Sequence, residues 1–410
     1  MRKVARMVAA ALIGLWSLSF VSCGGGGGLS SAPGGTAATA TNEVAVIVDS
    51  GPDPAQNPTE NTLYTTVTIC VPGSTTECQT IDHIQVDTGS VGLRILGAVS
   101  TLSLPVAQAT DGNSLMECTQ FVDGYSWGPI ASADIQVAGE KASSVPVQVI
   151  GGSAIAVPAA CAGTGTAEDT VAAFGANGIL GIGVFAQDCG ANCAPPNAGN
   201  TFYYSCTTAA CNEIAAPLNT QVLNPVSLFP VDNNGSIIVL PAVADAGAAT
   251  VSGSLIFGID TESNNASGSV TVLALDGNGD FVTTLGTQSL SESFLDSGSN
   301  GLFFYDLDYQ NVLCGTGFTN FYCPGSPQTL TATLTGAGAA PATTSVTFTF
   351  DNAQTVFTDN STFAAFPTVA GTYSNTLSFD WGLPFFFNRR VATAIEGMTT
   401  AVGTGPYMAF

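Results

Sequence analysis

Short runs in which apolar and polar residues alternate recur along most of this chain. Residues with high strand propensity, such as valine, isoleucine, threonine and phenylalanine, fill runs at 43–49, 63–71 and 343–350. Turn-forming residues separate these runs, as in DNNG at 232–235. Residues 43–410 contain no long stretch with the spacing of an amphipathic helix. The pattern therefore predicts an all-β protein.

The first 42 residues follow a different pattern. A basic start is followed by a short apolar run, too short to span a bilayer but typical of a signal peptide. FVSC at 20–23 resembles a bacterial lipobox, which implies a signal peptide at 1–22 and a lipid on Cys23. Residues 23–42 then form a flexible tether rich in glycine, serine, alanine and threonine. A plain secretory signal cleaved near this point is the alternative.

The lipobox resemblance also implies a location. Glycine after the lipidated cysteine is typical of lipoproteins that are sent to the outer membrane. We therefore expect an exported protein with a lipid anchor in the outer membrane of a Gram-negative bacterium, on its periplasmic or its surface face.

The cysteines agree with export. The chain has 11, and removing Cys23 leaves an even number that suits up to five disulfides in an oxidising compartment. A zinc site among the four cysteines at 189–211 is the alternative, which the compartment and the wide spacing disfavour. The disulfide candidates are the pairs Cys70–Cys78, Cys118–Cys161 and Cys314–Cys323, and the group Cys189, Cys193, Cys206 and Cys211, whose pairing stays open.

The charge balance is strongly acidic. Lysine and arginine number 7 against 30 aspartates and glutamates, for a net charge of −23. Nucleic-acid binding and electrostatic docking on an anionic membrane surface are excluded, because both need a basic surface. With so few basic partners, the fold should gain from partial neutralisation of its carboxylates. We therefore expect stability to hold or rise from neutral to mildly acidic pH.

The basic residues limit the available chemistry. His83 is the single histidine, so a multi-histidine zinc site cannot be built, and a Ser-His-Asp triad has one candidate base. His83 lies in an alternating run and is expected to be a strand residue rather than a catalyst. DGNGD at 276–280 lacks the later ligands of a calcium loop and predicts a hairpin turn. Acid–base chemistry must therefore rest on carboxylates, and we expect no metal and no cofactor.

One short motif occurs twice, about half the chain apart. DTGSVGL at 87–93 and DSGSNGL at 296–302 share Asp, Gly, Ser, Gly and Leu at the same positions. Each copy follows a strand-like run, IDHIQV at 81–86 and SESFL at 291–295. A single Asp-Ser/Thr-Gly is ordinary turn chemistry, but two copies in matching contexts indicate an internal duplication.

The duplication offers a pair of carboxylates as candidate catalytic residues, Asp87 and Asp296. Two carboxylates brought together cannot both ionise readily, so they share one proton. The charged member can take a proton from water while the neutral member donates one to a carbonyl. Glycines and hydroxyls of each motif can hydrogen-bond these carboxyls. The supporting residues are Thr88, Gly89, Ser90, Ser297, Gly298 and Ser299.

With these two motifs, the chain resembles the pepsin-like aspartic peptidases. The resemblance implies that it is a divergent bacterial lipoprotein member of that superfamily. YSWGPI at 125–130 looks like the family's flap hairpin, which makes Tyr125 and Gly128 the flap residues. Further segments follow in family order over roughly residues 60–410. They are NGILGIG at 177–183, SGSLIFGID at 252–260 and WGLPFFFNRRVATAIEG at 381–397.

The resemblance implies a fold and an activity. The fold is bilobal, with two β-barrel-like lobes at 43–245 and 246–410 related by a pseudo-two-fold axis and separated by a cleft. The activity is that of an aspartic-type endopeptidase, which hydrolyses a peptide or protein substrate held in an extended conformation, with apolar subsites. The sequence carries no signal of an oligomeric state.

Some residues depart from the family pattern. Arg94 stands where these enzymes usually have a tryptophan that bonds to the flap tyrosine, and we expect a structural role for it rather than a substrate contact. We expect Trp127 and Trp381 to be packing residues. These departures leave a second hypothesis, a catalytically inactive surface lipoprotein that keeps the fold to bind peptides or proteins. A non-peptidase adhesin or surface-layer protein is the third.

Overall fold

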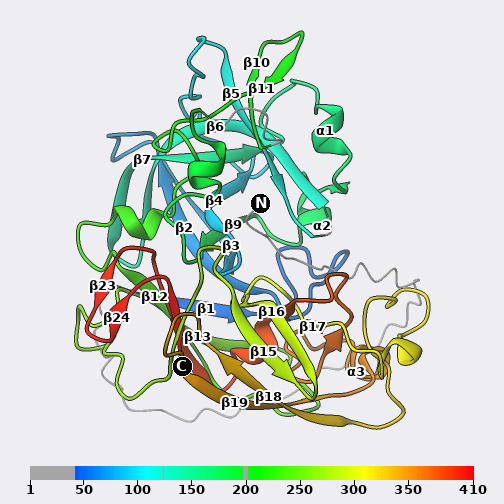
Figure 1. Cartoon of the computed structure of the whole chain (residues 1–410). Helices are drawn as coiled ribbons and strands as arrows, with labels where there is room; N and C mark the ends of the chain where they lie inside the picture. The colour runs from blue at the N-terminus through cyan, green and yellow to red at the C-terminus, as the bar shows by residue number, and fades with distance from the viewer. Residues whose placement is uncertain (1–41, 123, 197–201) are drawn as a thin grey trace, which may run out of the picture.

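The computed structural model describes residues 42–122, 124–196 and 202–410. The predicted signal peptide at 1–22, the lipid site at Cys23 and the tether up to residue 41 lie outside the described residues. Strands dominate the described part, which confirms the all-β class (Figure 1). None of its helices is long and apolar enough to cross a membrane. They are α1 (Ala159–Ala162), α2 (Val171–Phe174), α3 (Ala353–Asp359) and the 3-10 turns η1 (Gly190–Cys193), η2 (Pro225–Leu228), η3 (Gln310–Val312) and η4 (Leu383–Phe385).

The strands include the three runs predicted at 43–49, 63–71 and 343–350. Those of the first half are β1 (Glu43–Val48), β2 (Leu63–Cys70), β3 (Cys78–Asp87), β4 (Val91–Leu96), β5 (Ser114–Gln120), β6 (Gly124–Val137), β7 (Glu140–Ile150), β8 (Thr166–Ala167), β9 (Gly178–Ile182), β10 (Tyr203–Cys206), β11 (Cys211–Glu213) and β12 (Gly235–Leu240). Those of the second half are β13 (Val251–Phe257), β14 (Val272–Ala274), β15 (Phe281–Leu285), β16 (Gln288–Leu295), β17 (Leu302–Phe304), β18 (Gln328–Thr335), β19 (Thr343–Phe350), β20 (Ala370–Gly371), β21 (Phe379–Trp381), β22 (Arg389–Ala394), β23 (Thr399–Thr400), β24 (Gly403–Thr404) and β25 (Tyr407–Ala409).

Two sheets hold most of these strands. The larger one has 16 strands, in the main order β11-β10-β5-β6-β7-β4-β9-β3-β2-β1-β13-β12-β22-β25-β14. The smaller one has seven, in the order β19-β18-β15-β16-β21-β17-β20. In Figure 1 the strands from β2 to β11 lie in the upper part of the molecule, and β15 to β19 lie in the lower part.

The same four-strand arrangement occurs once in each half. In the first half β3 is parallel to β9, β9 is antiparallel to β4, and β4 is parallel to β7. In the second half β16, β21, β17 and β20 repeat this order with the same orientations. Asp87 ends β3, and Asp296 directly follows β16. The sequence repeat is therefore also a structural repeat, and it positions the two aspartates equivalently.

A continuous sheet joins the two halves. β1 pairs with β13 along its whole length and with β2 at two positions, so the first described strand belongs to both halves. β12 pairs with β13 and β22. The expected boundary at 245/246 thus falls between two strands that pair with each other, and a shared sheet rather than a flexible linker connects the halves.

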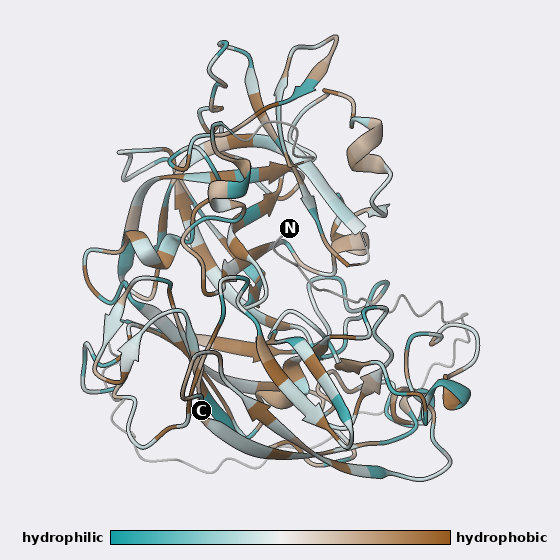
Figure 2. Ribbon diagram, viewed as in Figure 1, coloured by the Kyte–Doolittle hydropathy of each residue, from teal (hydrophilic) through white to brown (hydrophobic). Residues whose placement is uncertain are grey.

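Buried apolar side chains from the sheets form the core. The ribbon coloured by hydropathy shows hydrophobic positions along many of the strands (Figure 2). Aromatic rings are concentrated in the second half, where Phe379 stacks on Trp381 at 3.9 Å between ring centroids. Trp381 is fully buried, and its indole donates a hydrogen bond to Thr283 Oγ1 at 3.0 Å. Trp127 is also buried and donates to the Ile155 carbonyl. Both tryptophans are packing residues, as predicted.

The structure forms five disulfides among the described residues. The three predicted pairs are confirmed, and the open group resolves into two sequential pairs that each staple a short local loop. Because disulfides persist in oxidising compartments, they indicate an exported protein. The pairs are Cys70–Cys78, Cys118–Cys161, Cys189–Cys193, Cys206–Cys211 and Cys314–Cys323.

The Cys118–Cys161 disulfide should contribute more to stability than Cys206–Cys211. Their sequence separations are 43 and 5 residues, and a longer loop restricts the unfolded chain more. We expect replacing both cysteines by alanine to lower the free energy of unfolding by about 4 kcal/mol for the first pair and about 2 kcal/mol for the second. Urea unfolding of the two double variants measures this difference. Equal losses, or the reverse order, would contradict the prediction.

Candidate active site

The two repeated motifs meet where the halves of the molecule join. Asp87 and Asp296 are 1% and 0% exposed. A Cβ atom added to Gly89 would lie 2.7 Å from Asp296 Oδ1, and one added to Gly298 would lie 2.5 Å from Asp87 Oδ1. Each motif's glycine therefore faces the carboxyl of the other motif, at a distance that excludes any side chain. The structure thus brings together the two aspartates that the sequence singled out.

A reciprocal pair of hydrogen bonds holds the motifs together. Thr88 N donates to Ser297 Oγ at 3.1 Å, and Ser297 N donates to Thr88 Oγ1 at 3.0 Å. Each hydroxyl then donates across the junction, Thr88 to the Leu295 carbonyl and Ser297 to the Val86 carbonyl. This local two-fold network needs both halves, so the relative position of the two carboxyls depends on the folded protein as a whole.

The two carboxyls accept matching hydrogen bonds from backbone N–H groups but differ in the hydrogen bonds that they accept from serine hydroxyls. Gly89 N donates to Asp87 Oδ1, and Gly298 N donates to Asp296 Oδ1, both at 2.7 Å. Ser299 Oγ donates to Asp296 Oδ2 at 2.9 Å. The equivalent hydroxyl of the first motif, on Ser90, is buried and has no hydrogen-bond partner among the described residues. The two aspartates therefore have different environments.

The electrostatics favour a shared proton. Burial raises the pKa of Asp296 well above its usual range, and the charge of Asp87, the charge of Asp380 and a hydrogen bond with the Asp87 side chain raise it further. The hydrogen bond from Gly298 N opposes this rise. Asp296 is therefore the carboxyl that keeps a proton when its neighbour is ionised. One neutral and one charged carboxyl in contact form an acid–base pair.

A third carboxyl, Asp380, belongs to this site, and the sequence reasoning missed it. Asp380 lies in β21 beside Phe294, and the equivalent residue of the first half is Ile179 in β9. Its side chain is buried, and its Oδ2 accepts a hydrogen bond from Ser299 Oγ at 2.6 Å. Aligning the two halves would have revealed the signal, because an acid stands where the first half has an isoleucine.

Ser299 lies between two carboxyls and restricts their protonation. Its hydroxyl contacts Asp296 Oδ2 and Asp380 Oδ2, but a hydroxyl has a single proton to donate. For both contacts to be hydrogen bonds, at least one of the two carboxyls must carry a proton of its own. Burial raises the pKa of Asp380 well above its usual range, the Ser299 hydrogen bond lowers it, and the charge of Asp87 raises it. The site therefore holds three neighbouring carboxyls, and Ser299 couples the protonation of Asp296 to that of Asp380.

A cavity of about 280 Å³ opens beside the carboxyls. Both halves contribute to its lining, with the first motif on one side and β16 on the other. The turn at 276–280, predicted as a hairpin turn, also reaches the cavity through its last three residues. The lining residues are Thr88, Gly89, Ser90, Val91, Gly183, Val184, Phe185, Asn278, Gly279, Asp280, Glu292, Phe294, Leu295 and Met408.

The predicted flap residues do not line this cavity. Tyr125 lies at the start of β6 and is buried in a cluster with Trp127 and Tyr204. Gly128 is required for strand packing, because a Cβ there would lie 2.0 Å from the Val149 carbonyl oxygen. Packing against Trp127 and Tyr204 therefore holds Tyr125. The expected contact between a flap tyrosine and the cleft has no counterpart among the residues lining the cavity.

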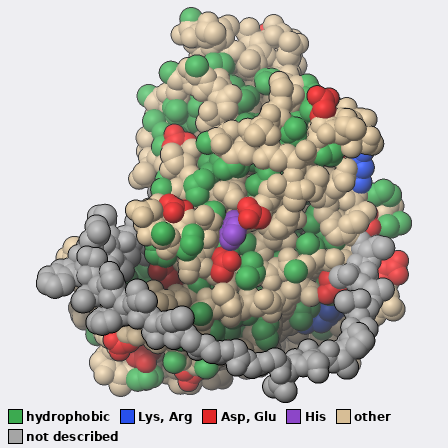
Figure 3. Space-filling model, turned by 180° about the vertical axis from the view of Figure 1, so that it is seen from behind, with side chains coloured by type: hydrophobic (Ala, Val, Ile, Leu, Met, Phe, Trp, Pro, Cys, Tyr) green, Lys and Arg blue, Asp and Glu red, His purple; other side chains and the backbone are tan. Residues whose placement is uncertain are grey.

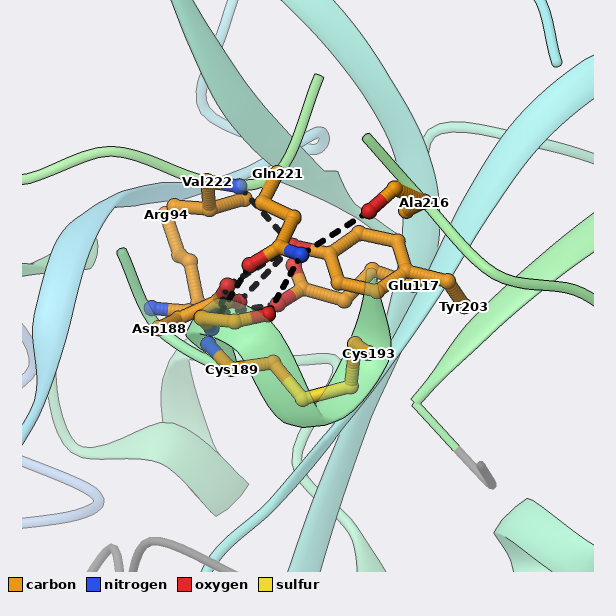
Figure 4. The surroundings of a disulfide bond; sticks show 10 residues. Arg94, Glu117, Asp188, Cys189, Cys193, Tyr203, Ala216, Gln221 and Val222 are labelled. Carbon is orange, nitrogen blue, oxygen red and sulfur yellow. Dashed lines mark hydrogen bonds and ion pairs between the residues drawn. A yellow bond between two sulfur atoms is a disulfide. The ribbon is translucent and has the colours of Figure 1, made fainter. Parts of the chain in front are cut away.

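Arg94 has the structural role that the sequence predicted. It is 1% exposed, and its Nη2 pairs with Glu117 Oε1 at 2.7 Å and with Asp188 Oδ2 at 3.0 Å (Figure 4). Tyr203 Oη donates to Asp188, and Nε of Arg94 donates to Thr119 Oγ1. This cluster links β4, which follows the first motif, to β5, β10 and the cysteine-rich segment. Arg94 is therefore not accessible to a substrate carboxylate.

His83 is a half-buried strand residue, as predicted. Its two ring nitrogens lie 3.3 Å from carboxylate oxygens of Asp49 and Asp82, and its ring contacts Tyr64. The space-filling view shows this histidine next to acidic side chains, on a face where acidic side chains outnumber basic ones (Figure 3). His83 is not among the residues that line the cavity.

Glu60 should make stability depend on pH. It precedes Asn61, whose side chain bonds to the Asn300 and Phe366 carbonyls across the junction of the halves. Burial raises the pKa of Glu60 from 4.5 to about 7. The folded state then binds this proton more tightly than the unfolded state, so the stabilisation is present below about pH 4.5 and is lost as the pH rises through about 7. The raised pKa values of Asp296 and Asp380 act in the same direction.

We therefore expect the free energy of unfolding to fall from pH 4.5 to pH 7.5, and Glu60→Gln to make this fall shallower. The matched control is Glu77→Gln, which removes an exposed carboxylate from the β2–β3 turn. Urea unfolding at intervals across this pH range measures the slope. An unchanged slope in Glu60→Gln would show that Glu60 is not responsible.

The fold and the site together define a class, an all-β exported protein with a pair of facing, buried carboxyls at a structural repeat. The family model described as protein of unknown function (DUF3443) matches residues 38–410, so the chain belongs to this family. No curated protein matches the chain. The matched range contains all three carboxyls of the site.

Proposed function

We propose that this protein is an aspartic-type endopeptidase with a pepsin-like fold. The observation that carries the proposal is the facing pair Asp87 and Asp296, held by the reciprocal hydrogen bonds of Thr88 and Ser297. This arrangement supplies an acid and a base to one small space and needs neither a metal nor a histidine. Because both the acid and the base are carboxyls, the proposed catalysis does not depend on the few basic residues of the chain.

The pepsin-like architecture belongs to the same proposal. Its two lobes are residues 43–245 and 246–410, related by a pseudo-two-fold axis, with the substrate cleft between them. The repeated four-strand arrangement, β3-β9-β4-β7 and β16-β21-β17-β20, supports this relation. The cavity lined from both halves supports the position of the cleft.

The proposed reaction is direct attack of water on a peptide carbonyl. The ionised Asp87 takes a proton from the water as its oxygen attacks the carbonyl carbon. Asp296, which burial and Asp87 keep protonated, donates its proton to the carbonyl oxygen. Collapse of the resulting gem-diol breaks the C–N bond: Asp87 gives its proton to the leaving amine, and one diol hydroxyl returns its proton to Asp296 as the new carbonyl forms. The two carboxyls return to one shared proton, so no other reagent is consumed.

The cellular setting is also proposed. We infer from the lipobox at 20–23 that Cys23 carries a lipid and anchors the protein to the outer membrane of a Gram-negative bacterium. The five disulfides support export but do not distinguish a lipid anchor from a plain secretory signal. Mass spectrometry of the protein's N-terminal peptide distinguishes them, because a diacylated cysteine adds a defined mass.

The activity test uses the purified full chain in detergent. It is incubated with an unfolded protein from pH 3 to pH 7.5, with and without a statine-type transition-state analogue. Cleavage that the analogue blocks supports the proposal. Absence of cleavage at every pH, from a folded and fully disulfide-bonded sample, would overturn it.

A binding protein without turnover is the second candidate. Its supporting observation is Tyr125, which is buried in a cluster with Trp127 and Tyr204 and does not line the cavity. On this alternative, the cleft holds an extended peptide or protein segment without hydrolysing it. Binding of the statine-type analogue without any cleavage is the result that this candidate predicts.

Asp380 should set the alkaline limit of the proposed activity. As the pH rises, an ionised Asp380 competes for the Ser299 proton and adds charge beside Asp296. In Asp380→Asn that charge is gone and an amide group donates to Ser299 at every pH, which leaves the Ser299 proton for Asp296. Both changes lower the pKa of Asp296, so the alkaline limb of kcat/KM should move downward by about one pH unit. Asp380→Leu removes the charge without supplying a donor, so it should move the limb in the same direction by less. An alkaline limb that stays in place in Asp380→Asn would contradict this role.

A further inference from the structure

The smaller sheet ends in a strand whose outer edge has no partner in the described part of the chain. β19 is at one end of the strand order, and all eight of its residues pair with β18. Among the described residues, no backbone group of 343–350 bonds to any other segment. Figure 1 shows β19 at the lower border of the molecule. An edge about 27 Å long is therefore open for pairing.

This edge lacks the features by which proteins usually protect an open strand. Natural edge strands are short or bulged, or they carry charged residues or proline. The other strands at the ends of the two sheet orders, β11, β14 and β20, have three, three and two residues. β19 has eight, its register with β18 is uninterrupted, and it contains neither a charged residue nor a proline. A strand of this kind is a template for pairing with another strand.

The segment that contains this edge is also free of charge. The chain has a net charge of −23, yet no charged residue occurs between Asp308 and Asp351. That segment includes the whole of β18 and β19. Two copies of so acidic a chain repel each other, and this repulsion is weakest where an uncharged segment faces another. A basic partner, by contrast, gains no electrostatic attraction from these two strands.

The two faces of the β18–β19 hairpin define what a further strand must offer. On the solvent face the hydroxyl oxygens of Thr331 and Thr347 lie 2.9 Å apart, and a second pair of threonines repeats this contact. On the opposite face Val346 and Phe348 are buried. A strand that continues this sheet must therefore present hydroxyls on one face and apolar side chains on the other. β19 itself has this pattern.

We propose that β19 pairs with the β19 of a second copy of this chain, antiparallel and about a two-fold axis at Thr347. This register places Thr347 opposite Thr347 and Ser345 opposite Thr349 on the solvent face. On the buried face it places Val346 opposite Phe348, and pairs of a β-branched and an aromatic residue stabilise antiparallel strands. A shift by one residue would set threonines against apolar side chains.

The pairing produces a closed dimer, because the same edge is used by both copies. The two seven-stranded sheets become one sheet of 14 strands. β16, which directly precedes Asp296, lies three strands from β19 in that sheet. The dimer therefore extends the sheet that carries the second motif, and the inference does not rest on the proposed activity.

The N-terminal segment of the chain itself is the other available occupant of this edge. Residues 24–41 lie outside the described residues, and their sequence includes seven glycines and a proline. Both residue types are unfavourable in strands, so the segment matches the edge less well than β19 does. The experiment below distinguishes the two occupants.

Sedimentation of the purified full chain in a density-matched detergent measures the association. The native chain should convert from monomer to dimer as its concentration rises from micromolar to submillimolar. Thr347→Glu sets two like charges opposite each other at the axis and should weaken the dimer at least about tenfold. Thr347→Lys should have the same effect. A mixture of the two variants should recover the dimer, because each glutamate then faces a lysine.

Thr331→Glu is the matched control. Thr331 is exposed and its hydroxyl contacts that of Thr347, so the same charge is added on the same face but one strand away from the edge. In the proposed dimer the two copies of residue 331 are about 14 Å apart, beyond the screening length of about 10 Å at 0.1 M salt. This variant should leave the dimer intact. Thermal unfolding checks that each variant is folded.

Hydrogen exchange of peptides that cover 343–350 locates the contact. Their amides should exchange more slowly as the concentration of the native chain rises, and this change should be absent in Thr347→Glu. A chain that stays monomeric throughout overturns the inference, as does a dimer that Thr347→Glu leaves intact or that Thr331→Glu weakens equally. Slow exchange of 343–350 in a monomer at every concentration also overturns it, and assigns the edge to another segment of the same chain.

Discussion

Replacing Asp87 by asparagine should reduce the proposed peptide hydrolysis at least about a thousandfold, and replacing Asp296 should have the same effect. Asparagine occupies nearly the same volume, so the hydrogen bonds from Gly89 N and Gly298 N can persist. An amide, however, neither accepts the proton of the attacking water nor shares a proton with its neighbour. Because the two carboxyls act as a unit, the double variant should lose little more than either single variant.

The same substitutions should not lower stability. Removing one of two adjacent buried carboxyls relieves the repulsion that raises the pKa of Asp296. The free energy of unfolding at pH 7 should therefore stay the same or rise, and thermal unfolding beside the activity assay measures it. A folded Asp87→Asn protein that still cleaves at the original rate would remove Asp87 from the mechanism. A loss of activity that only accompanies unfolding would not count as support.

Replacing Arg94 by methionine should lower the free energy of unfolding by about 3–5 kcal/mol at pH 7. Arg94 is the buried cation between Glu117 and Asp188, and methionine keeps the apolar stem without the charge. Two buried carboxylates are then left without their cation. Burial already raises the pKa of Asp188, so protonation relieves part of this penalty and the loss should be smaller at pH 5.

Two further variants test this explanation. Lys141→Met breaks the ion pair with Asp134, but Lys141 is 40% exposed, so its loss should cost less than about 1 kcal/mol. The triple variant Arg94→Met, Glu117→Gln, Asp188→Asn removes the uncompensated charges and should recover part of the stability. Urea unfolding compares these proteins. Equal losses for Arg94→Met and Lys141→Met would show that burial of the arginine does not control the energetics.

The sequence predicted the central features of this site because they are local. Asp-Thr/Ser-Gly-Ser is a contiguous motif, each copy follows an alternating run, and repetition distinguishes it from ordinary turns. The hydroxyls of Thr88 and Ser297 were assigned to support the pair, and they make the reciprocal contacts. Short-range disulfides such as Cys70–Cys78 could be paired because a few residues of separation leave few alternatives.

Other features were missed because they depend on distant segments. Asp380 lies in a strand of three residues, and its part in the site follows from the parallel pairing of β21 with β16. Glu117 and Asp188 are individually unremarkable acids until folding places both against Arg94. Tyr125 matched a flap pattern, and its surroundings in the structure include Cys161 and Tyr204 from segments far along the chain.

The sequence by itself determined the all-β class, the acidic balance, the duplication and the identity of the carboxyl pair, because alternation, composition and contiguous motifs can be identified without knowing any long-range contact. Only the tertiary structure decided which groups surround that pair. Ser299 joins Asp296 to Asp380, and the 276–280 turn brings Asp280 to the cavity, through contacts between segments far apart in the chain. Protonation and specificity depend on burial and on charges within a few ångströms, and these are properties of the packed molecule.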